Sequence, residues 1–193
     1  MICEWNLTRF AESLLSLIDR DQSEAIKIAS ECLDEYQTKF RDYWLDAMKK
    51  KLGIFNAEPE DLMLVEDLLM LMYKHQADYT NTFRNINKPS QLNERLFNDA
   101  GFHYWMIKWN ERLSRQTQSI SEAQALMDQH NPLVIPRNHL VEDALEQASK
   151  GDVQPFHELL NVLLTPYAEP KDGKYVVSPD ANDDMNYRTF CGT

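Results

Sequence analysis

Residues 22–53 read QSEAIKIASECLDEYQTKFRDYWLDAMKKKLG, and this stretch decides the fold. Its apolar side chains recur at spacings of three and four residues, which keeps one seam on the same side of a helix over about three heptads. The seam comprises Ile26, Ala29, Leu33, Tyr36, Phe40, Tyr43 and Ala47. Asp21 and Glu24 suit the start of such a helix, and Gly53 suits the position just after its end. The stretch therefore predicts one long amphipathic helix that packs against partner helices.

The same helical period continues on both sides of this stretch. We expect a helix over 5–18 upstream and further helices over 62–72, 92–97, 102–113, 119–129, 137–150 and 153–164. Strict alternation, which is typical of strands, is missing from the first 165 residues. The predicted fold class is all-α: a multi-helix bundle with one long second helix and an irregular C-terminal tail. We expect residues 1–164 to form the helical domain, and residues 165–193 to extend over the bundle or over a domain outside this chain.

Local signals refine three of these helices. Residues 62–72 are apolar on nearly every face, which predicts a helix at the centre of the core. Ser119 and Glu122 have the spacing of a capping box. Asp152 follows Gly151 and is expected to be the N-cap of the last helix.

Composition and charge exclude several functions. The chain of 193 residues has 20 Lys and Arg against 31 Asp and Glu, a net charge of −11, which has the wrong sign for binding nucleic acid. Its five glycines stand apart, whereas a phosphate-binding loop needs them clustered. No apolar run approaches the ~18 residues of a membrane span, and no secretory signal opens the chain. We therefore expect no nucleic acid, no membrane contact and a cytoplasmic location.

Motifs for chemistry are equally scarce. The five histidines are dispersed, with no HExxH pair, and the three cysteines, Cys3, Cys32 and Cys191, include no CxxC. This pattern argues against a zinc site and a disulfide framework. Signatures of serine hydrolases and protein kinases are also missing. From the residues alone we predict no catalytic residue, metal site or cofactor in this chain.

Two segments do not suit a plain bundle. Residues 131–138, NPLVIPRN, place Arg137 and Asn138 in the first turn of a helix, where the helix dipole disfavours a cation. A buried carboxylate is the favoured partner for Arg137, and a phosphate or another chain is the alternative. The last seven residues, YRTFCGT, carry Tyr187, Phe190 and the accessible thiol of Cys191. Two aromatic residues in a polar tail indicate docking onto another surface, unless the tail and its thiol are simply solvated.

The chain resembles the C-terminal region of the selenoprotein O (YdiU) family. The resemblance runs through ordered blocks over nearly all 193 residues. The blocks at the front are Trp5-Asn6-Leu7 with Arg9, Ala11 and Leu14-Leu15, then Lys51-Leu52-Gly53, Asp78-Tyr79-Thr80 and Phe83-Arg84. Those at the back are Asn131-Pro132 through Arg137-Asn138-His139, Glu142-Asp143-Ala144-Leu145, Gly151-Asp152, Pro166-Tyr167 and the final seven residues.

This resemblance implies a function that the residues alone do not. Family members are longer, kinase-like proteins, related in sequence to pseudokinases, that transfer AMP from ATP to Ser, Thr or Tyr of proteins with Mg²⁺ or Mn²⁺. Their catalytic residues precede the Trp-Asn-Leu block, so none carries over to this chain, and the abrupt amphipathic start at Trp5 leads us to expect a preceding domain. The resemblance also implies that Cys191 is redox-active and forms a reversible disulfide with a cysteine of the catalytic domain.

The sequence therefore leaves two candidate functions. The first is a non-catalytic C-terminal region that packs on its own N-terminal kinase-like domain, with protein substrates bound by the full-length enzyme. Candidate interface residues are Trp5, Arg84, Arg137, Asn138, Tyr187 and Phe190, although Arg84 and Arg137 also suit internal ion pairs. The alternative is a stand-alone acidic helical module that binds a partner protein. An apolar patch left open on the isolated chain would favour a dimer.

Overall fold

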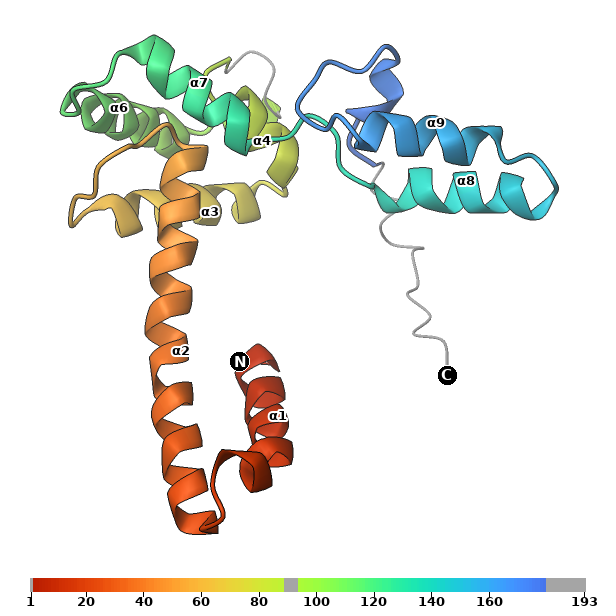
Figure 1. Cartoon of the computed structure of the whole chain (residues 1–193). Coiled ribbons are helices and arrows are strands. Elements are labelled where there is room, and N and C mark those ends of the chain that lie inside the picture. Colours follow the sequence, from red (N-terminus) through yellow and green to blue (C-terminus); the bar gives the residue numbers. More distant parts are fainter. Residues whose placement is uncertain (1, 89–93, 180–193) are drawn as a thin grey trace. The chain divides into compact units, whose positions relative to one another are not determined.

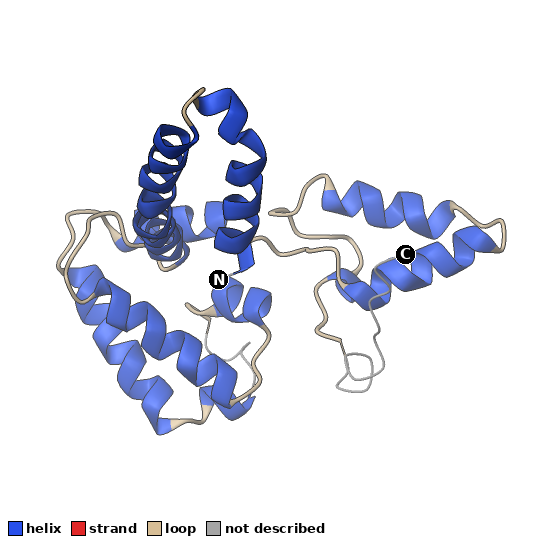
Figure 2. Ribbon diagram, turned by 90° about the horizontal axis from the view of Figure 1, so that it is seen from below, coloured by secondary structure: helices blue, strands red, loops and turns tan. Residues whose placement is uncertain are grey.

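The computed structural model describes residues 2–88 and 94–179. These residues contain α-helices and one 3₁₀ helix and no strand, which confirms the predicted all-α class (Figure 2). The helices are α1 (Ile2–Ile18), α2 (Gln22–Lys51), α3 (Asp61–Lys74), α4 (Tyr79–Asn85), α5 (Glu94–Phe97), α6 (Ala100–Ser114), α7 (Ile120–His130), α8 (Asn138–Ser149) and α9 (Gln154–Leu163), followed by the 3₁₀ turn η2 (Gly173–Tyr175). The long second helix, α2, is confirmed at 30 residues (Figure 1).

The chain divides into two compact units, residues 1–48 and residues 49–193. The first unit holds α1 and most of α2. At the start of α2, the Asp21 carboxylate accepts hydrogen bonds from the backbone N–H groups of Ser23 and Glu24. This contact is the expected helix start, because an aspartate there satisfies N–H groups that have no partner within the helix.

The core of the second unit is built around the tryptophans of α6. Phe102 stacks on Trp105 with 5.9 Å between ring centroids, and Trp105 stacks on Trp109 with 5.7 Å. The Trp105 indole donates to the Leu64 carbonyl at 2.7 Å, and the Trp109 indole donates to the Leu52 carbonyl at 2.9 Å. Each buried indole N–H therefore has an acceptor, and the two bonds connect α6 to α3 and to the end of α2.

The predicted central helix is buried on one side only. The inward face of α3 carries Leu64, Val65, Leu68 and Met72, all buried. Met63 and Met70 on its other face remain 62% and 71% exposed. The expectation of burial all round was wrong, because Glu66 and Asp67 in the middle of the segment lie three or four residues from Met63 and Met70 and mark a face turned to solvent.

A smaller core joins α8 and α9, which lie side by side (Figure 1). It is formed by buried Val134, Ala144, Leu159 and Tyr175, with Leu140 and Val162 packed against them. Tyr175 comes from the residues after α9, so the segment 165–179 contributes to this core. Gly151 turns the chain between the two helices with a φ of 95°, a conformation that suits glycine.

Helix ends agree with some predictions and correct others. The capping box of α7 is confirmed, with Ser119 and Glu122 bonding each other's backbone. The N-cap of α9 is Val153 rather than Asp152, although the Asp152 carboxylate still accepts from the Gln154 N–H at 3.0 Å. Arg137 is the N-cap of α8 and not part of its first turn.

Candidate functional site

Arg137 is the centre of a partly buried polar group that we call the Arg137 cluster: Asp78, Asn81, Arg137, Val176 and Ser178. The guanidinium donates from Nη1 to Asp78 Oδ2 at 2.7 Å and from Nη2 to Asp78 Oδ1 at 3.2 Å. Asn81 accepts from Arg137 and donates to the Val176 carbonyl and the Ser178 hydroxyl, each at 3.0 Å. The predicted carboxylate partner of Arg137 is confirmed as Asp78. The cluster ties the start of α4 to the start of α8 and to residues 176–178.

Asp78 also caps α4, accepting from the Asn81 backbone N–H at 2.8 Å. Burial acts to raise the pKa of Asp78, but the hydrogen bonds from Arg137 and Asn81 outweigh burial and hold that pKa below its ordinary value. The carboxylate is therefore ionised at neutral pH and balances the charge of Arg137, whose side chain is only 5% exposed.

Two other cations meet the C-terminal end of α7. Arg84 Nη1 lies 3.1 Å from the Asp128 carboxylate and donates to the Asn131 carbonyl at 3.1 Å. Lys51 donates to the His130 carbonyl at 3.1 Å and to the Asn131 side-chain oxygen at 3.2 Å. A cation at this end of a helix is stabilised by the helix dipole and satisfies its last carbonyls. The two side chains therefore hold the end of α7 to α4 and to the end of α2.

Lys51 also lies over two aromatic rings. Its ammonium is 5.5 Å from the ring centroid of Tyr79 and 5.3 Å from that of Phe83. Burial lowers the pKa of Lys51. The aromatic faces and the carbonyl oxygens replace part of the hydration that this cation loses.

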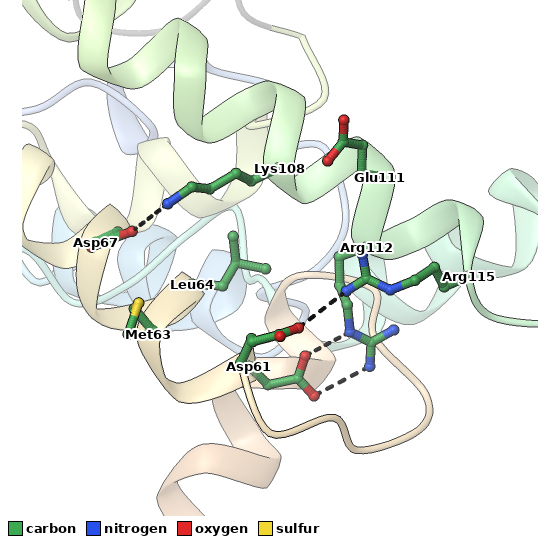
Figure 3. A pocket seen from close by; sticks show the side chains of 9 residues that line it. Asp61, Met63, Leu64, Asp67, Lys108, Glu111, Arg112 and Arg115 are labelled. Atoms are coloured by element: carbon green, nitrogen blue, oxygen red, sulfur yellow. Dashed lines mark hydrogen bonds and ion pairs between the residues drawn. The ribbon is translucent and has the colours of Figure 1, made fainter.

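A pocket of about 230 Å³ opens between α3 and α6, and we call it the α3–α6 pocket (Figure 3). It is lined by Glu60, Asp61, Met63, Leu64, Asp67, Lys108, Glu111, Arg112 and Arg115. At its base Arg112 Nε donates to Asp61 Oδ1 at 2.6 Å, and both side chains are almost completely buried. At the rim Lys108 donates to Asp67 at 3.2 Å.

The α3–α6 pocket does not suit a nucleotide. Arg112 already binds Asp61, Glu58 and Asn56, and Arg115 binds Glu58. A triphosphate in the pocket would therefore meet carboxylates that have already neutralised the cations it needs. No Ser, Thr, Cys or His side chain lines it either. Its chemistry is that of a buried ion pair joining α3 to α6.

An apolar groove lies within residues 1–48, and we call it the α1–α2 groove. Its volume is about 650 Å³. It is lined by Leu7, Phe10, Ala11, Leu14 and Ile18 of α1 and by Ile28, Ala29, Cys32, Leu33, Tyr36, Lys39, Phe40 and Tyr43 of α2. Lys39 is the one charged residue among them. The groove is a surface for apolar side chains rather than a reaction site.

The predicted site residues fall into three groups. Arg84 and Arg137 form internal ion pairs. Trp5 is 61% exposed, with the Arg9 guanidinium 5.7 Å from its ring centroid, and Asn138 is exposed at the start of α8. None of these four residues lines the α3–α6 pocket or the α1–α2 groove. The remaining three, Tyr187, Phe190 and Cys191, lie outside the described residues.

Sequence reasoning missed two parts of this picture. One is the Asp61–Arg112 pair, whose members are 51 residues apart in the chain. The other is Asp78, although an Asp three residues before Asn81 at the start of an amphipathic segment is a recognisable N-cap signal. Among the described residues, no group of three or more His, Cys, Asp or Glu could hold a metal ion, and no helix is long and apolar enough to cross a membrane.

Comparison with known proteins shows which family this helical chain belongs to. Residues 1–164 match the family model described as Protein adenylyltransferase SelO. The chain belongs to the SelO family. Three curated relatives, each named Protein nucleotidyltransferase YdiU, are 46% identical to it: those of Halalkalibacterium halodurans over 190 residues, Alkaliphilus metalliredigens over 194 and Geobacillus kaustophilus over 191.

The alignments with these relatives cover nearly all of this chain but a minor part of each relative. The alignments include 98%, 100% and 98% of this chain but 39% of each of the three relatives. The chain therefore spans about two fifths of the length of the curated relatives it matches. The residues that line the α3–α6 pocket and the α1–α2 groove all lie within the part of the chain that the family model matches. The same is true of the Arg137 cluster except for Val176 and Ser178.

Proposed function

We propose that this chain is the helical, non-catalytic C-terminal region of a SelO-type protein adenylyltransferase, and that the longer protein transfers AMP from ATP to Ser, Thr or Tyr of protein substrates. One observation carries the proposal: the chain matches its relatives almost from end to end while accounting for 39% of their length. The part of the relatives outside the match is long enough for a complete catalytic domain.

The roles of the arginines support the proposal that this chain is a non-catalytic region of the longer protein. Arg84, Arg112 and Arg137 all serve ion pairs that hold helices together. ATP, Mg²⁺ or Mn²⁺ and the protein substrates then belong to a kinase-like domain in the rest of the longer protein. Trp5 and Asn138 are the exposed described residues that we assign to contact with that domain.

The proposal includes a redox role for Cys191 and a cytoplasmic location. In the oxidised state the Cys191 thiol and a thiol of the catalytic domain would form a disulfide, giving two electrons and two protons to a disulfide oxidant such as oxidised glutathione. The free thiols of Cys3 and Cys32 suit a reducing compartment. Cys191→Ser in the longer protein is expected to abolish any change of activity with added reductant, and an unchanged response would remove Cys191 from the mechanism.

Calorimetric titration of the 193-residue chain with ATP and Mg²⁺ tests the absence of a nucleotide site. We expect no saturable heat at ATP concentrations up to about 1 mM, because the cations of the α3–α6 pocket are already neutralised. The full-length Geobacillus kaustophilus relative is the matched control. A micromolar dissociation constant for the isolated chain would contradict the proposal.

A second candidate function is favoured by the α1–α2 groove. The chain would then be an acidic helical module that binds a partner protein through an apolar surface. The two functions differ in genomic context. A coding frame that continues upstream of Met1 into a kinase-like domain supports the first, and an independent transcript that begins at Met1 supports the second.

A further inference from the structure

The first unit buries too little to form a core of its own. Among residues 2–47, all of which the structure describes, Ala25 and Ala29 are the buried ones. Helix α1 buries none of its 17 residues. A unit of fewer than 50 residues is marginal even with a complete core, so this pair of helices needs further apolar cover.

The surface that needs cover is the α1–α2 groove. Phe10 and Tyr43 line it and are 62% and 76% exposed, and Leu7, Ile28 and Phe40 are between 37% and 44% exposed. A small-molecule site encloses most of its ligand, whereas here large apolar side chains stand out beside a hollow of about 650 Å³. This shape suits a packed polypeptide segment, such as the apolar face of a helix.

The charge of the first unit disfavours a second copy of the chain as the occupant. Residues 1–48 carry ten acidic and five basic side chains. Two copies that met at the groove would bring two surfaces of the same net charge together, which opposes their association. The groove is therefore better suited to apolar side chains from a polypeptide that is neutral or basic at this surface.

The longer relatives contain additional polypeptide in the same molecule as these helices. The alignment with the Alkaliphilus metalliredigens relative includes 100% of this chain, and so the whole groove, but 39% of that relative. Under the proposed function the additional part precedes residue 1, and α1, which begins at Ile2, continues directly from it. Leu7 on the groove then lies about 9 Å from the junction, at the helical rise of 1.5 Å per residue.

We infer that the α1–α2 groove packs against apolar side chains of the part of the longer protein that precedes this chain. A segment attached at the start of α1 is held beside the groove at an effective concentration of the order of millimolar. A separate partner, by contrast, loses translational and rotational freedom when it binds. The inference rests on the proposed function and names the surface through which the C-terminal region joins the rest of the protein.

Amide hydrogen exchange read by mass spectrometry tests the inference. The 193-residue chain at about 1 μM is compared with the longer protein, encoded by a frame that continues upstream of Met1. In the longer protein we expect exchange in α1 and in residues 22–43 of α2 to slow about tenfold or more, because helices with apolar cover open less often. Exchange in α6, which already buries Trp105 and Trp109, should change less than about threefold.

A substitution in the groove separates this interface from other effects of the longer chain. Phe10→Asp places a charge on the covered surface, so exchange in α1 of the longer protein should return to within about threefold of its rate in the 193-residue chain. Leu17→Asp is the matched control, because Leu17 belongs to the same helix and is 80% exposed but does not line the groove. It should change the rate less than about threefold. Circular dichroism of each variant identifies any loss of helix.

The wild-type comparison decides the inference without any variant. Equal exchange of α1 in the two proteins overturns it, and a longer protein that still transfers AMP would leave the proposed function standing without this interface. A coding frame that begins at Met1 overturns both. Protection of α1 that appears in the 193-residue chain only at high concentration, with none in the longer protein, would assign the groove to a second copy instead.

Discussion

The two units use the same helical period with opposite results. In residues 49–193, the apolar face of α6 meets α3 and the end of α2, and Phe102, Trp105 and Trp109 are buried. In residues 1–48, α1 and α2 have seams of equal regularity, yet Phe10 and Tyr43 are mostly exposed. Amphipathic periodicity therefore predicts which face of a helix is apolar. Whether that face is buried in a core depends on the number of other helices that pack against it.

The units also differ in how they use charge. Arg112 and Arg137 of the second unit are buried with carboxylate partners. In the first unit the pairs Arg9–Glu12 and Lys39–Glu35 lie on exposed helix surfaces. Buried pairs are costly to break because a charge is left without a partner, whereas exposed pairs contribute little. The comparison predicts that substitutions in the second unit have the larger effects.

The largest effect is expected from Asp61→Ala. It leaves the Arg112 guanidinium buried without its main carboxylate, which costs about 3–5 kcal/mol in the free energy of unfolding. Urea denaturation followed by tryptophan fluorescence measures this change. Glu60→Ala is the control, because Glu60 is the adjacent acid but its side chain is 79% exposed, and it should cost less than about 0.5 kcal/mol. Equal losses of unfolding free energy from the two substitutions would show that the buried Asp61–Arg112 pair contributes no more to stability than an exposed acid does.

Asp78→Ala is expected to cost about 2 kcal/mol, because it removes the cap of α4 and one partner of Arg137 while Asn81 still accepts from the guanidinium. Amide hydrogen exchange should quicken first in α4 and at the start of α8, the elements that the Arg137 cluster joins. If protection falls in α6 and not in α8, the cluster does not hold α8 as described.

Asp99 gives the second unit a dependence on pH. Hydrogen bonds from Lys74, then His75, and from the backbone of Gly101 and Phe102 hold the pKa of Asp99 well below its usual range. A lowered pKa stabilises the fold while the carboxylate is ionised in both states, so the contribution is complete above about pH 5 and is lost as the pH falls from about 4 toward the pKa in the folded state.

Urea midpoints of the wild type and of Asp99→Asn between pH 3 and 7 test this dependence. The gap between the two proteins should be widest at neutral pH and should narrow as the pH falls below 4. A gap that stays constant over this range would show that ionisation of Asp99 does not contribute to stability.

The smallest effect on stability is expected in the first unit. At concentrations where the chain is monomeric, Phe10→Ala should change the free energy of unfolding by less than about 0.5 kcal/mol, because most of the Phe10 side chain is already exposed. The same urea experiment measures it. A loss above 2 kcal/mol in the monomer would show that Phe10 is covered within its own chain.

Local features of this fold were predictable from the sequence, whereas the long-range pairs were not. The Ser119 and Glu122 capping box and the glycine ends at Gly53 and Gly151 follow from neighbours within a few residues, and the structure has all of them. Arg137 was expected to have a carboxylate partner, but Asp78 lies 59 residues away, and many acids of this chain were equally suitable. The exposed side of α3 was missed because the many apolar residues of 62–72 were given more weight than Glu66 and Asp67, which lie three or four residues from the exposed Met63 and Met70.

Transfer of radiolabelled AMP tests the central claim most directly. Purified 193-residue chain and the full-length Geobacillus kaustophilus relative are each incubated with α-labelled ATP, Mg²⁺ or Mn²⁺ and a mixture of cellular proteins. The account predicts labelled protein with the relative and none above background with this chain, because Arg84, Arg112 and Arg137 hold helices together instead of binding phosphate. Label transferred by the isolated chain would contradict the account.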